Sequence, residues 1–332
     1  MKVPFWDPSR DYFKYQQKYQ EAIHRVLSQG DLILRSDLEE FERNFADFVG
    51  TKYAVGVASG TDALILSMKV MEIGHGDEVI VPSYTFRATL EAVHHAGATP
   101  VLVDLGEDWR TVRTDKTRAI IPAHIAGHIL DWNVDEFIDM IEDSCQALGA
   151  APVRGVTACY SFYPAKILGC FGDGGAVATN DSYVYEELLK MRNHYKGDWD
   201  KFGYNSRLDN LQAAILNIKL ANIQKNLQRR KIIANLYDKA LKGIVGIPVE
   251  RDVYQDYIIH CPTEIERDEL QRFLEIKGIG SMKNGYPFPL ETPKLPNAVR
   301  YESRSLRIPC NQNLSDEEVE YVISRIKQFY TR

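Results

Sequence analysis

Apolar segments of strand length alternate with helical segments in the first third of the chain, and no other feature constrains the fold as much. AVGVA at 54–58, VIVP at 79–82 and TPVLVDL at 99–105 predict three buried strands. Apolar residues at helical spacing over about 61–71 and 86–96 predict helices between them. Strands that alternate with helices form a largely parallel sheet that is covered on both faces.

Beyond residue 105 the apolar runs lie closer together, and some of the gaps leave little room for a helix. Four further strands are predicted, at RAIIPAH (118–124), FIDMIED (137–143), ACYSFY (158–163) and GGAVATN (174–180). Helical patterns then cover 184–193 and a long stretch from about Arg207 to Leu241, where apolar residues recur every three or four positions.

The composition changes near residue 245, and the last part of the chain reads as a smaller α+β domain. VYQDYIIHCP predicts a strand, and RDELQRFLEIKGI predicts a helix that ends at Gly278 and precedes another strand. The final helix begins at Ser315 with Glu318 three residues later, which is the spacing of a capping box. We therefore expect a large domain over 1–240, which includes the long helix, and a small domain over 241–332.

Charge and cysteine content exclude several classes of protein. With 40 Lys and Arg against 46 Asp and Glu, the chain has a formal charge of −6 and lacks the basic footprint of a nucleic-acid-binding protein. No apolar run reaches the roughly 18 residues of a membrane span, and the first residues lack the apolar core of a secretory signal.

Five cysteines without a C-x-x-C pair argue against disulfides and a metal centre, so we expect a cytoplasmic protein.

Three local signals suggest a site, although the common nucleotide, hydrolase and zinc-protease motifs are absent. Ser59-Gly60-Thr61 lies between a strand and a helix, where free N–H groups bind anions, or where Ser59 simply caps the helix. Glu142-Asp143 ends an apolar strand, and Lys166 follows the next one; a loop acid that caps a turn and a solvated lysine are the alternative readings. Together they match the needs of pyridoxal phosphate: a phosphate cradle, a carboxylate for the ring nitrogen and an amine for the aldehyde. Phe86 follows the second strand, where it could stack on the ring.

Longer segments of the sequence resemble the DegT/DnrJ/EryC1/StrS family of nucleotide-sugar aminotransferases. The resemblance starts near Leu32 and is carried by GTDALILSMKVMEIGHGDEVIVPSYTFRATLEAVHHAGATPVLVD, IEDSCQALGA, SFYPAKILGCFGDGGAVATND, GYNSRLDNLQAAIL and SLRIPCNQNLSDEE. It implies an α/β fold of the aspartate-aminotransferase type (fold type I), with a mixed seven-stranded sheet in the large domain and a small α+β C-terminal domain. It also implies a homodimer whose active sites are shared between subunits.

The resemblance assigns roles to individual residues. It implies that Lys166 forms the Schiff base, that Asp143 contacts the pyridine nitrogen and that Gln146 lies near the ring hydroxyl. Phe86 is expected to stack on the ring, and the phosphate is expected to be bound by Gly60, Thr61 and Ser161, with Asn205 reaching the partner subunit's phosphate site. The residues expected to lie toward the substrate are His194, Tyr195 and Tyr286. The implied reaction is transamination of a nucleotide-linked keto sugar by L-glutamate in amino-sugar or polysaccharide biosynthesis. GTDAL and NSRLD favour a 3-keto over a 4-keto sugar.

Two departures and two alternatives accompany this resemblance. The stretch between Val103 and Asp143 is short, so we expect a crossover helix of the outer layer to be trimmed or missing. Gly285 and Glu291 stand where the family usually has histidines, toward the substrate. One alternative is a sugar dehydratase of the same family, in which histidine replaces the lysine that this chain retains as Lys166. The other is a cofactor-free binding or regulatory protein on the same scaffold.

Overall fold

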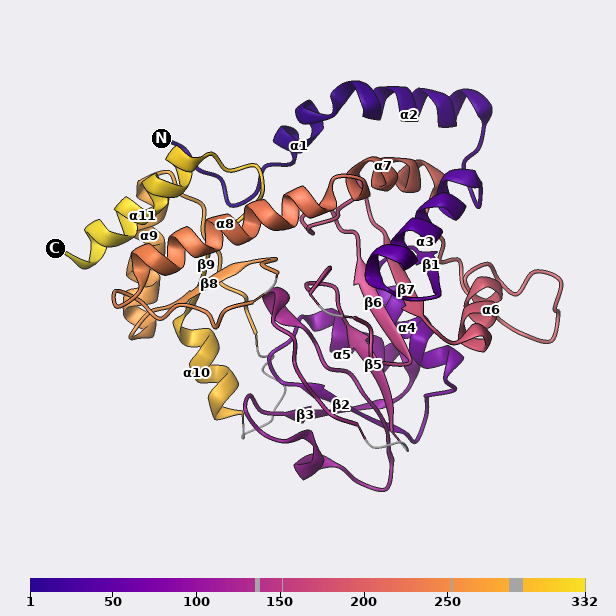
Figure 1. The fold of residues 1–332 in the computed structure, drawn as a ribbon. Coiled ribbons are helices and arrows are strands. Elements are labelled where there is room, and N and C mark those ends of the chain that lie inside the picture. Colours follow the sequence, from indigo (N-terminus) through magenta and orange to yellow (C-terminus); the bar gives the residue numbers. More distant parts are fainter. Residues whose placement is uncertain (135–137, 151, 252, 287–294, 332) are drawn as a thin grey trace.

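The computed structural model describes residues 1–134, 138–150, 152–251, 253–286 and 295–331 (Figure 1). The strands are β1 (Tyr53–Val57), β2 (Glu78–Pro82), β3 (Thr99–Val103), β4 (Thr117–Ile120), β5 (Asp139–Asp143), β6 (Thr157–Ser161), β7 (Gly175–Thr179), β8 (Tyr257–His260) and β9 (Ser305–Ile308). The α-helices are α1 (Pro8–Lys14), α2 (Gln16–Gln29), α3 (Ser36–Val49), α4 (Gly60–Val70), α5 (Arg87–Ala96), α6 (Ser182–Met191), α7 (Asn210–Leu220), α8 (Ile223–Leu241), α9 (Glu264–Ile276), α10 (Pro296–Arg304) and α11 (Asp316–Tyr330).

Seven strands form one mixed sheet in the order β1-β7-β6-β5-β4-β2-β3. β7 is antiparallel to both of its neighbours, and the other neighbouring pairs are parallel. The carboxyl ends of β1, β2, β5 and β6 therefore lie at the same edge of the sheet, where ligands bind in open α/β sheets. The predicted seven strands and their mixed arrangement are confirmed.

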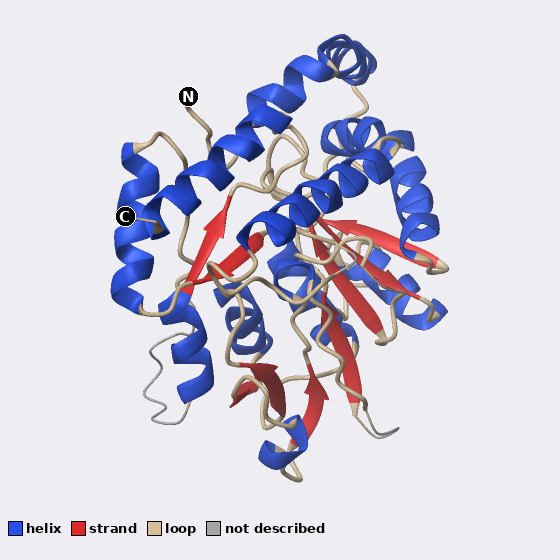
Figure 2. Cartoon of the chain, turned by 60° about the vertical axis from the view of Figure 1, so that its left-hand side comes forward, coloured by secondary structure: helices blue, strands red, loops and turns tan. Residues whose placement is uncertain are grey.

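The two faces of this sheet are covered differently. One face packs against α4, α5 and α6, whose apolar side chains meet Val79, Val81 and Ile141 of the strands. The opposite face packs against α3 and α7 over β1, β6 and β7. Figure 2 shows these helices around the large sheet, with the two strands of the small sheet as a separate group.

No α-helix lies between β3 and β5 in the part of this stretch that the structure describes, which leaves out 135–137. The connections contain only two short 3₁₀ helices, at Trp109–Val112 and Ile125–Gly127. The side chains of Trp109 and Trp132 instead cover Ile80 and Met140, which lie on the same face of the sheet as α3 and α7 but over strands that those two helices do not cover. Two large indole rings thus replace the outer layer that a crossover helix normally supplies.

We expect Trp109→Ala to destabilise the protein strongly. The ring is fully buried, and its indole N–H donates a hydrogen bond to the backbone oxygen of Asn133 at 3.2 Å. Loss of such a side chain costs about 3–5 kcal/mol of unfolding free energy, measurable by denaturant unfolding. Trp199→Ala is the matched control, because Trp199 is 94% exposed and should change stability by less than about 0.5 kcal/mol. Equal stability of the two variants would contradict the covering role of Trp109.

The small sheet has its own hydrophobic core. β8 and β9 pair antiparallel, and α9, α11 and the second half of α8 pack on them. This core already includes Ile233 of α8 and Val3 from the N-terminal segment, so side chains before residue 241 contribute to it. The division at 240/241 remains our proposal for the domain boundary.

The long helix expected over Arg207–Leu241 is wrong in two respects. The helical region begins only at Asn210, and it is interrupted between α7 and α8 at Ala221 and Asn222. The side-chain amide of Asn222 donates to the backbone oxygen of Ile218 at 3.0 Å. An asparagine side chain that bonds a nearby carbonyl competes with the helical ladder, which accounts for the break.

The end of the chain agrees in part with the expectations. The capping box at α11 is confirmed, because the Ser315 hydroxyl accepts from the Glu318 N–H and the Glu318 carboxylate accepts from the Ser315 N–H. The strand expected after Gly278 is wrong: Ile279 and Met282 make only isolated bridges, to Val3 and Arg307. Helices α1, α2, α3 and α10 were not anticipated. No helix among the described residues is long and apolar enough to cross a membrane.

Candidate active site

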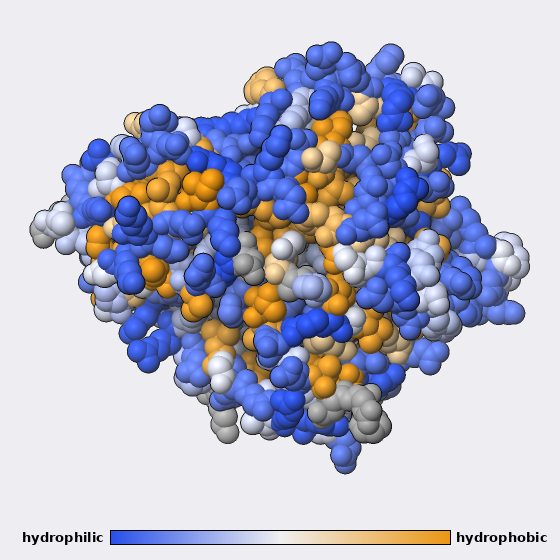
Figure 3. Space-filling view, in the orientation of Figure 1, coloured by the Kyte–Doolittle hydropathy of each residue, from blue (hydrophilic) through white to orange (hydrophobic). Residues whose placement is uncertain are grey.

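A cavity of about 760 Å³ lies at the carboxyl edge of the large sheet, between that sheet and the small sheet. Most of the residues singled out in the sequence line it: Gly60, Thr61, Phe86, Asp143, Gln146, Ser161, Lys166 and Tyr286. They come from five separate connections, which the fold brings to one place. Figure 3 shows hydrophobic residues gathered near the centre of one face of the molecule, surrounded by hydrophilic surface.

The connection from β1 to α4 forms one end of the cavity. Ser59 caps α4, with its hydroxyl accepting from the Asp62 N–H, so capping and cavity lining occur together. The N–H groups of Gly60 and Thr61 come at the start of the helix, where no intrahelical acceptor exists and the helix dipole attracts anions. A Cβ on Gly60 would lie 2.8 Å from both the Cys145 sulfur and the Ser161 Cβ. Glycine therefore keeps this cradle open.

The Asp143 carboxylate is held at the end of β5. One oxygen accepts from the Thr89 hydroxyl at 2.7 Å, and the other accepts from the Cys145 N–H at 3.2 Å. The Thr89 hydroxyl is itself within 2.8 Å of the Thr85 hydroxyl. Asp143 is buried, and these contacts fix its orientation in the cavity wall.

Lys166 lies in a tight turn after β6. Its N–H donates to the backbone oxygen of Tyr163 at 2.8 Å, and a Cβ on Gly169 would come within 2.5 Å of the Pro164 oxygen. Gln255 reaches this turn from the other side of the cavity. Its side chain accepts from the Ile167 N–H and donates to the Ala165 oxygen. The lysine is thus clamped by the segment that leads into β8.

Three further side chains line the middle of the cavity. Phe86 is 55% exposed at the start of α5, and its ring lies 6.1 Å from that of Tyr286. The Gln146 side chain accepts from the Ala126 N–H at 2.9 Å and also contacts the Tyr286 hydroxyl. Burial raises the pKa of Tyr286 above its ordinary value, so its hydroxyl stays protonated.

The remaining predicted residues lie elsewhere. Asn205 is exposed, five residues before α7, so it does not cap that helix; Asp209 occupies that position. His194 is exposed, whereas Tyr195 is buried in the large core and its hydroxyl donates to Glu187 at 2.9 Å. This arrangement does not support a substrate role for Tyr195. Gly285 is described, but Glu291 lies outside the described residues.

Several residues that line the cavity or support its wall carry no sequence signal. Thr89, which bonds Asp143, lies inside a helix, and Gln255 and Arg307 are more than eighty residues beyond Lys166. His124 also lines the cavity, where its Nδ1 accepts from the Leu130 N–H. That bond leaves the proton of the neutral ring on Nε2. These partners are set by tertiary contacts and not by local spacing.

The residues present fit pyridoxal phosphate. The open cradle at Gly60 would take the phosphate, the oriented Asp143 carboxylate would take the ring nitrogen, and the Lys166 amine would take the aldehyde. Burial raises the pKa of the neighbouring Cys145 thiol, which keeps that sulfur protonated and unreactive beside the amine.

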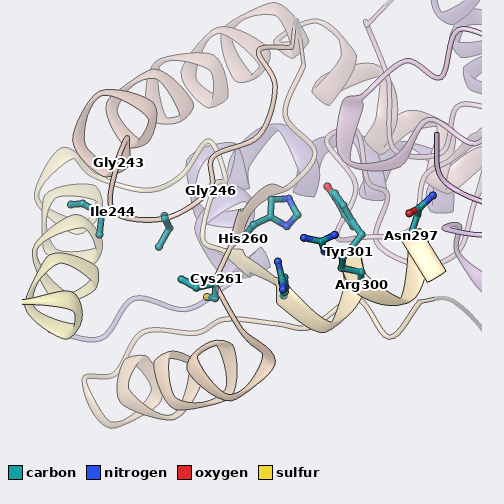
Figure 4. Close-up of a pocket in the computed structure, with 11 residues that line it drawn as sticks. Gly243, Ile244, Gly246, His260, Cys261, Asn297, Arg300 and Tyr301 are labelled. Atoms are coloured by element: carbon teal, nitrogen blue, oxygen red, sulfur yellow. The ribbon is translucent and has the colours of Figure 1, made fainter. Parts of the chain in front are cut away.

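A second cavity, of about 590 Å³, lies on the outer side of the small sheet (Figure 4). It is lined by His260 and Cys261 at the end of β8, by Arg300 and Tyr301 of α10, and by the loop at 243–246. None of the residues predicted from the sequence lines it. The chemistry of the chain therefore centres on the first cavity.

The profile of the DegT/DnrJ/EryC1/StrS aminotransferase family matches residues 14–327. The dTDP-3-amino-3,4,6-trideoxy-alpha-D-glucose transaminase of Streptomyces venezuelae is 37% identical, over an alignment that covers 100% of this chain and 97% of that protein. The UDP-2-acetamido-2-deoxy-3-oxo-D-glucuronate aminotransferase of Pseudomonas aeruginosa is 33% identical, with 98% and 99% covered.

Solved structures agree with these sequence relatives. The S. venezuelae DesV structure superimposes with a TM-score of 0.92 at 35% identity, and the match covers 100% of this chain and 99% of DesV. The PLP-form of the sugar aminotransferase Spr1654 from Streptococcus pneumoniae gives a TM-score of 0.87 at 25% identity, with 95% and 96% covered.

Proposed function

This chain belongs to the DegT/DnrJ/EryC1/StrS aminotransferase family, and from that premise we propose that it transfers the amino group of L-glutamate to a nucleotide-linked keto sugar. The class of enzyme is established by the family: the protein is a pyridoxal-phosphate-dependent sugar aminotransferase. The observation that carries the proposal is the convergence of Gly60, Asp143 and Lys166 on one cavity at the sheet edge.

In the proposed mechanism, Lys166 holds the cofactor and moves the proton. When bound, pyridoxal phosphate supplies an aldehyde that takes up the amino group and a ring that draws electrons from the reacting carbon. The Lys166 amine, once released by the amino donor, takes the proton from the donor's α-carbon as a general base. Asp143 keeps the ring nitrogen protonated, because its anionic oxygens are held in place by Thr89 and the Cys145 N–H.

Other residues of the cavity position the reactants. The N–H groups of Gly60 and Thr61, with the Ser161 hydroxyl, would bind the phosphate, and Phe86, which lines the same cavity, would stack on the ring. Gln146, whose side chain is held by the Ala126 N–H and by Tyr286, would lie beside the ring hydroxyl. Tyr286 faces the substrate end of the same cavity.

The names of the relatives support a sugar that is aminated at C3. Those from S. venezuelae, Aneurinibacillus thermoaerophilus and P. aeruginosa are named for 3-amino or 3-oxo sugars, whereas another relative is a GDP-perosamine synthase. A panel of nucleotide-linked 3-keto and 4-keto sugars, incubated with L-glutamate and followed by mass spectrometry, tests this assignment. We expect amination of a 3-keto sugar; amination of 4-keto sugars alone would overturn the preference. Loss of water from the sugar without amination would favour the dehydratase alternative.

We also propose that the enzyme works as a homodimer in which Asn205 reaches the partner's phosphate site. In support of this, Asn205 is exposed and does not line the cavity of its own chain, while its neighbour Ser206 is fixed by a hydrogen bond to Asp62 at 2.6 Å. Inactive Lys166→Ala and Asn205→Ala subunits are then expected to complement each other. In a mixed dimer one site carries both lesions and the other carries neither.

The measurement is the activity regained when the two variants are mixed, alongside a tagged-subunit assay of exchange. Up to about half of the mixed dimers' sites should be active, and each variant mixed with itself serves as the control. Confirmed exchange without any regained activity would place Asn205 and Lys166 in the same subunit's site, and the shared-site proposal would fail.

A further inference from the structure

Arg307 brings a guanidinium group into the active-site cavity from the small sheet. Leu306 and Ile308, its neighbours in β9, are fully buried in the core of the small sheet. Side chains alternate along a strand, so Arg307 points the opposite way. It lines the same cavity as Lys166 and Asp143.

The hydrogen bonds of this guanidinium are only partly used. Nη1 donates to the Asp256 carboxylate at 2.9 Å, and Nη2 has only a weak contact with the Met282 sulfur at 3.9 Å. Nε is buried and has no acceptor among the described residues. The Nε and Nη2 groups form the edge of a guanidinium that binds a carboxylate with two parallel bonds. Both groups of this edge therefore lack a strong acceptor among the described residues, although Nε itself is buried.

The other cationic side chains that line the cavity already make hydrogen bonds or ion pairs with residues of the protein. Arg230 is buried and donates to the backbone oxygens of Tyr254, Gln255 and Cys310. Lys283 pairs with Asp268 at 2.6 Å, and Lys166 is assigned to the cofactor. Within the described lining, Arg307 is therefore a cation that keeps unused donors, at Nε and Nη2, for a substrate anion.

Asp256 keeps this group charged and oriented. Burial alone would lower the pKa of Arg307, but the nearby Asp256 carboxylate raises it above its usual value. The Phe5 ring lies 5.4 Å from the guanidinium carbon and covers one face of the group. A charged donor edge in a place with little water binds an anion more strongly than an exposed one.

We propose that Arg307 binds a carboxylate of the amino-acid donor and that Asp256 is its positioning residue. The inference rests on the proposed function, in which L-glutamate supplies the amino group. Under this proposal the two substrates use different residues: the carboxylate of the amino donor is bound by Arg307 of the small sheet, and the keto sugar is not bound by Arg307. Arg307 is then a specificity-determining residue for the first half of the reaction.

The test measures the two half-reactions of the holoenzyme separately. Loss of the cofactor's visible absorbance on adding L-glutamate reports the donor half, and product mass reports the transfer to the keto sugar. In Arg307→Gln we expect the half-saturating glutamate concentration to rise about 10- to 100-fold, the range for losing charged hydrogen bonds. Half-saturation by the keto sugar should change less than about threefold.

A binding measurement that needs no turnover accompanies the kinetics. Glutarate, which has the two carboxylates of glutamate but no amine, should bind the wild-type holoenzyme saturably in calorimetry and bind Arg307→Gln at least about 10-fold more weakly. Arg307→Lys should recover only part of this affinity, because an ammonium cannot make the paired bonds. The double variant Arg307→Gln with Asp256→Asn removes both charges, so no unpaired carboxylate remains to impair folding.

Arg300→Gln is the matched control. Arg300 is exposed in the second cavity and has no ion pair with a described residue (Figure 4), so the same charge is removed away from the site. Unchanged glutamate saturation in Arg307→Gln, or equal weakening of both half-reactions, would overturn the inference. If the wild type uses a different amino acid, the glutamate proposal fails and the same comparison with that donor decides the role of Arg307.

Discussion

The Lys166→Ala variant should bind pyridoxal phosphate but fail to turn over. The cradle at Gly60, the Asp143 carboxylate and the Phe86 ring remain in the cavity, whereas the covalent link and the proton carrier are lost. General acid–base groups contribute about 10²- to 10⁴-fold to a rate, so we expect a loss of at least this size. Steady-state assays measure the turnover, and dialysis followed by cofactor release with acid measures the bound cofactor.

The matched control for this experiment is Lys225→Ala, because Lys225 is exposed on α8 and does not line the cavity. Its turnover should equal that of the wild type. Wild-type turnover in Lys166→Ala would remove the lysine from the mechanism. Loss of cofactor from both variants would point to a general weakening of the fold.

Asp143→Asn should fold and should lose most of its activity. The neutral amide cannot hold a proton on the ring nitrogen, and a neutral ring draws electrons poorly from the reacting carbon. Electrostatic contributions of this kind are worth about 10²- to 10³-fold in rate. The Thr89 hydroxyl and the Cys145 N–H bond different oxygens of Asp143, so the single amide oxygen can keep the bond from the Cys145 N–H while the amide NH₂ donates to the Thr89 hydroxyl, which limits the structural cost.

Asp139→Asn provides the comparison on the same strand. Asp139 lies at the opposite end of β5, where it pairs with Arg118 at 3.0 Å. It should keep near-normal turnover, and both variants should show wild-type circular dichroism. A rate for Asp143→Asn close to that of Asp139→Asn would contradict the electron-sink role of Asp143.

The strands and the residues at their ends could be predicted because their signals are local. A buried strand such as β7 is a short apolar run, Asp143 is recognisable as a polar residue at the end of one, and Lys166 follows another within a few residues. Turn residues and caps, such as Ser59 and Ser315, are set by bonds to residues two or three positions away. Such bonds can be recognised in the sequence from the short, fixed spacing between the two residues that make them.

The parts that could not be predicted depend on distant contacts. Thr89 bonds Asp143, and Gln255 clamps the turn at Lys166, yet nothing in their local sequence marks them. The break at Asn222 cannot be predicted from apolar periodicity, because the apolar residues keep their helical spacing across it. The bond from the Asn222 side chain to the Ile218 oxygen, which accounts for the break, does not change that spacing. The pairing of Arg307 with Asp256 likewise needs the folded small sheet.

The pairing of β1 with β7 has a consequence for synthesis of the chain. Tyr53 of β1 lies opposite Thr179 of β7, so β1 is synthesised well before the strand with which it pairs. At typical rates of translation, this delay is roughly ten seconds. A Cβ on Gly175 would come within 2.4 Å of Ser59, so arrival of β7 also completes the packing around the phosphate cradle. The phosphate cradle is thus incomplete until β7 has emerged, and the apolar β1 edge stays unpaired during this interval.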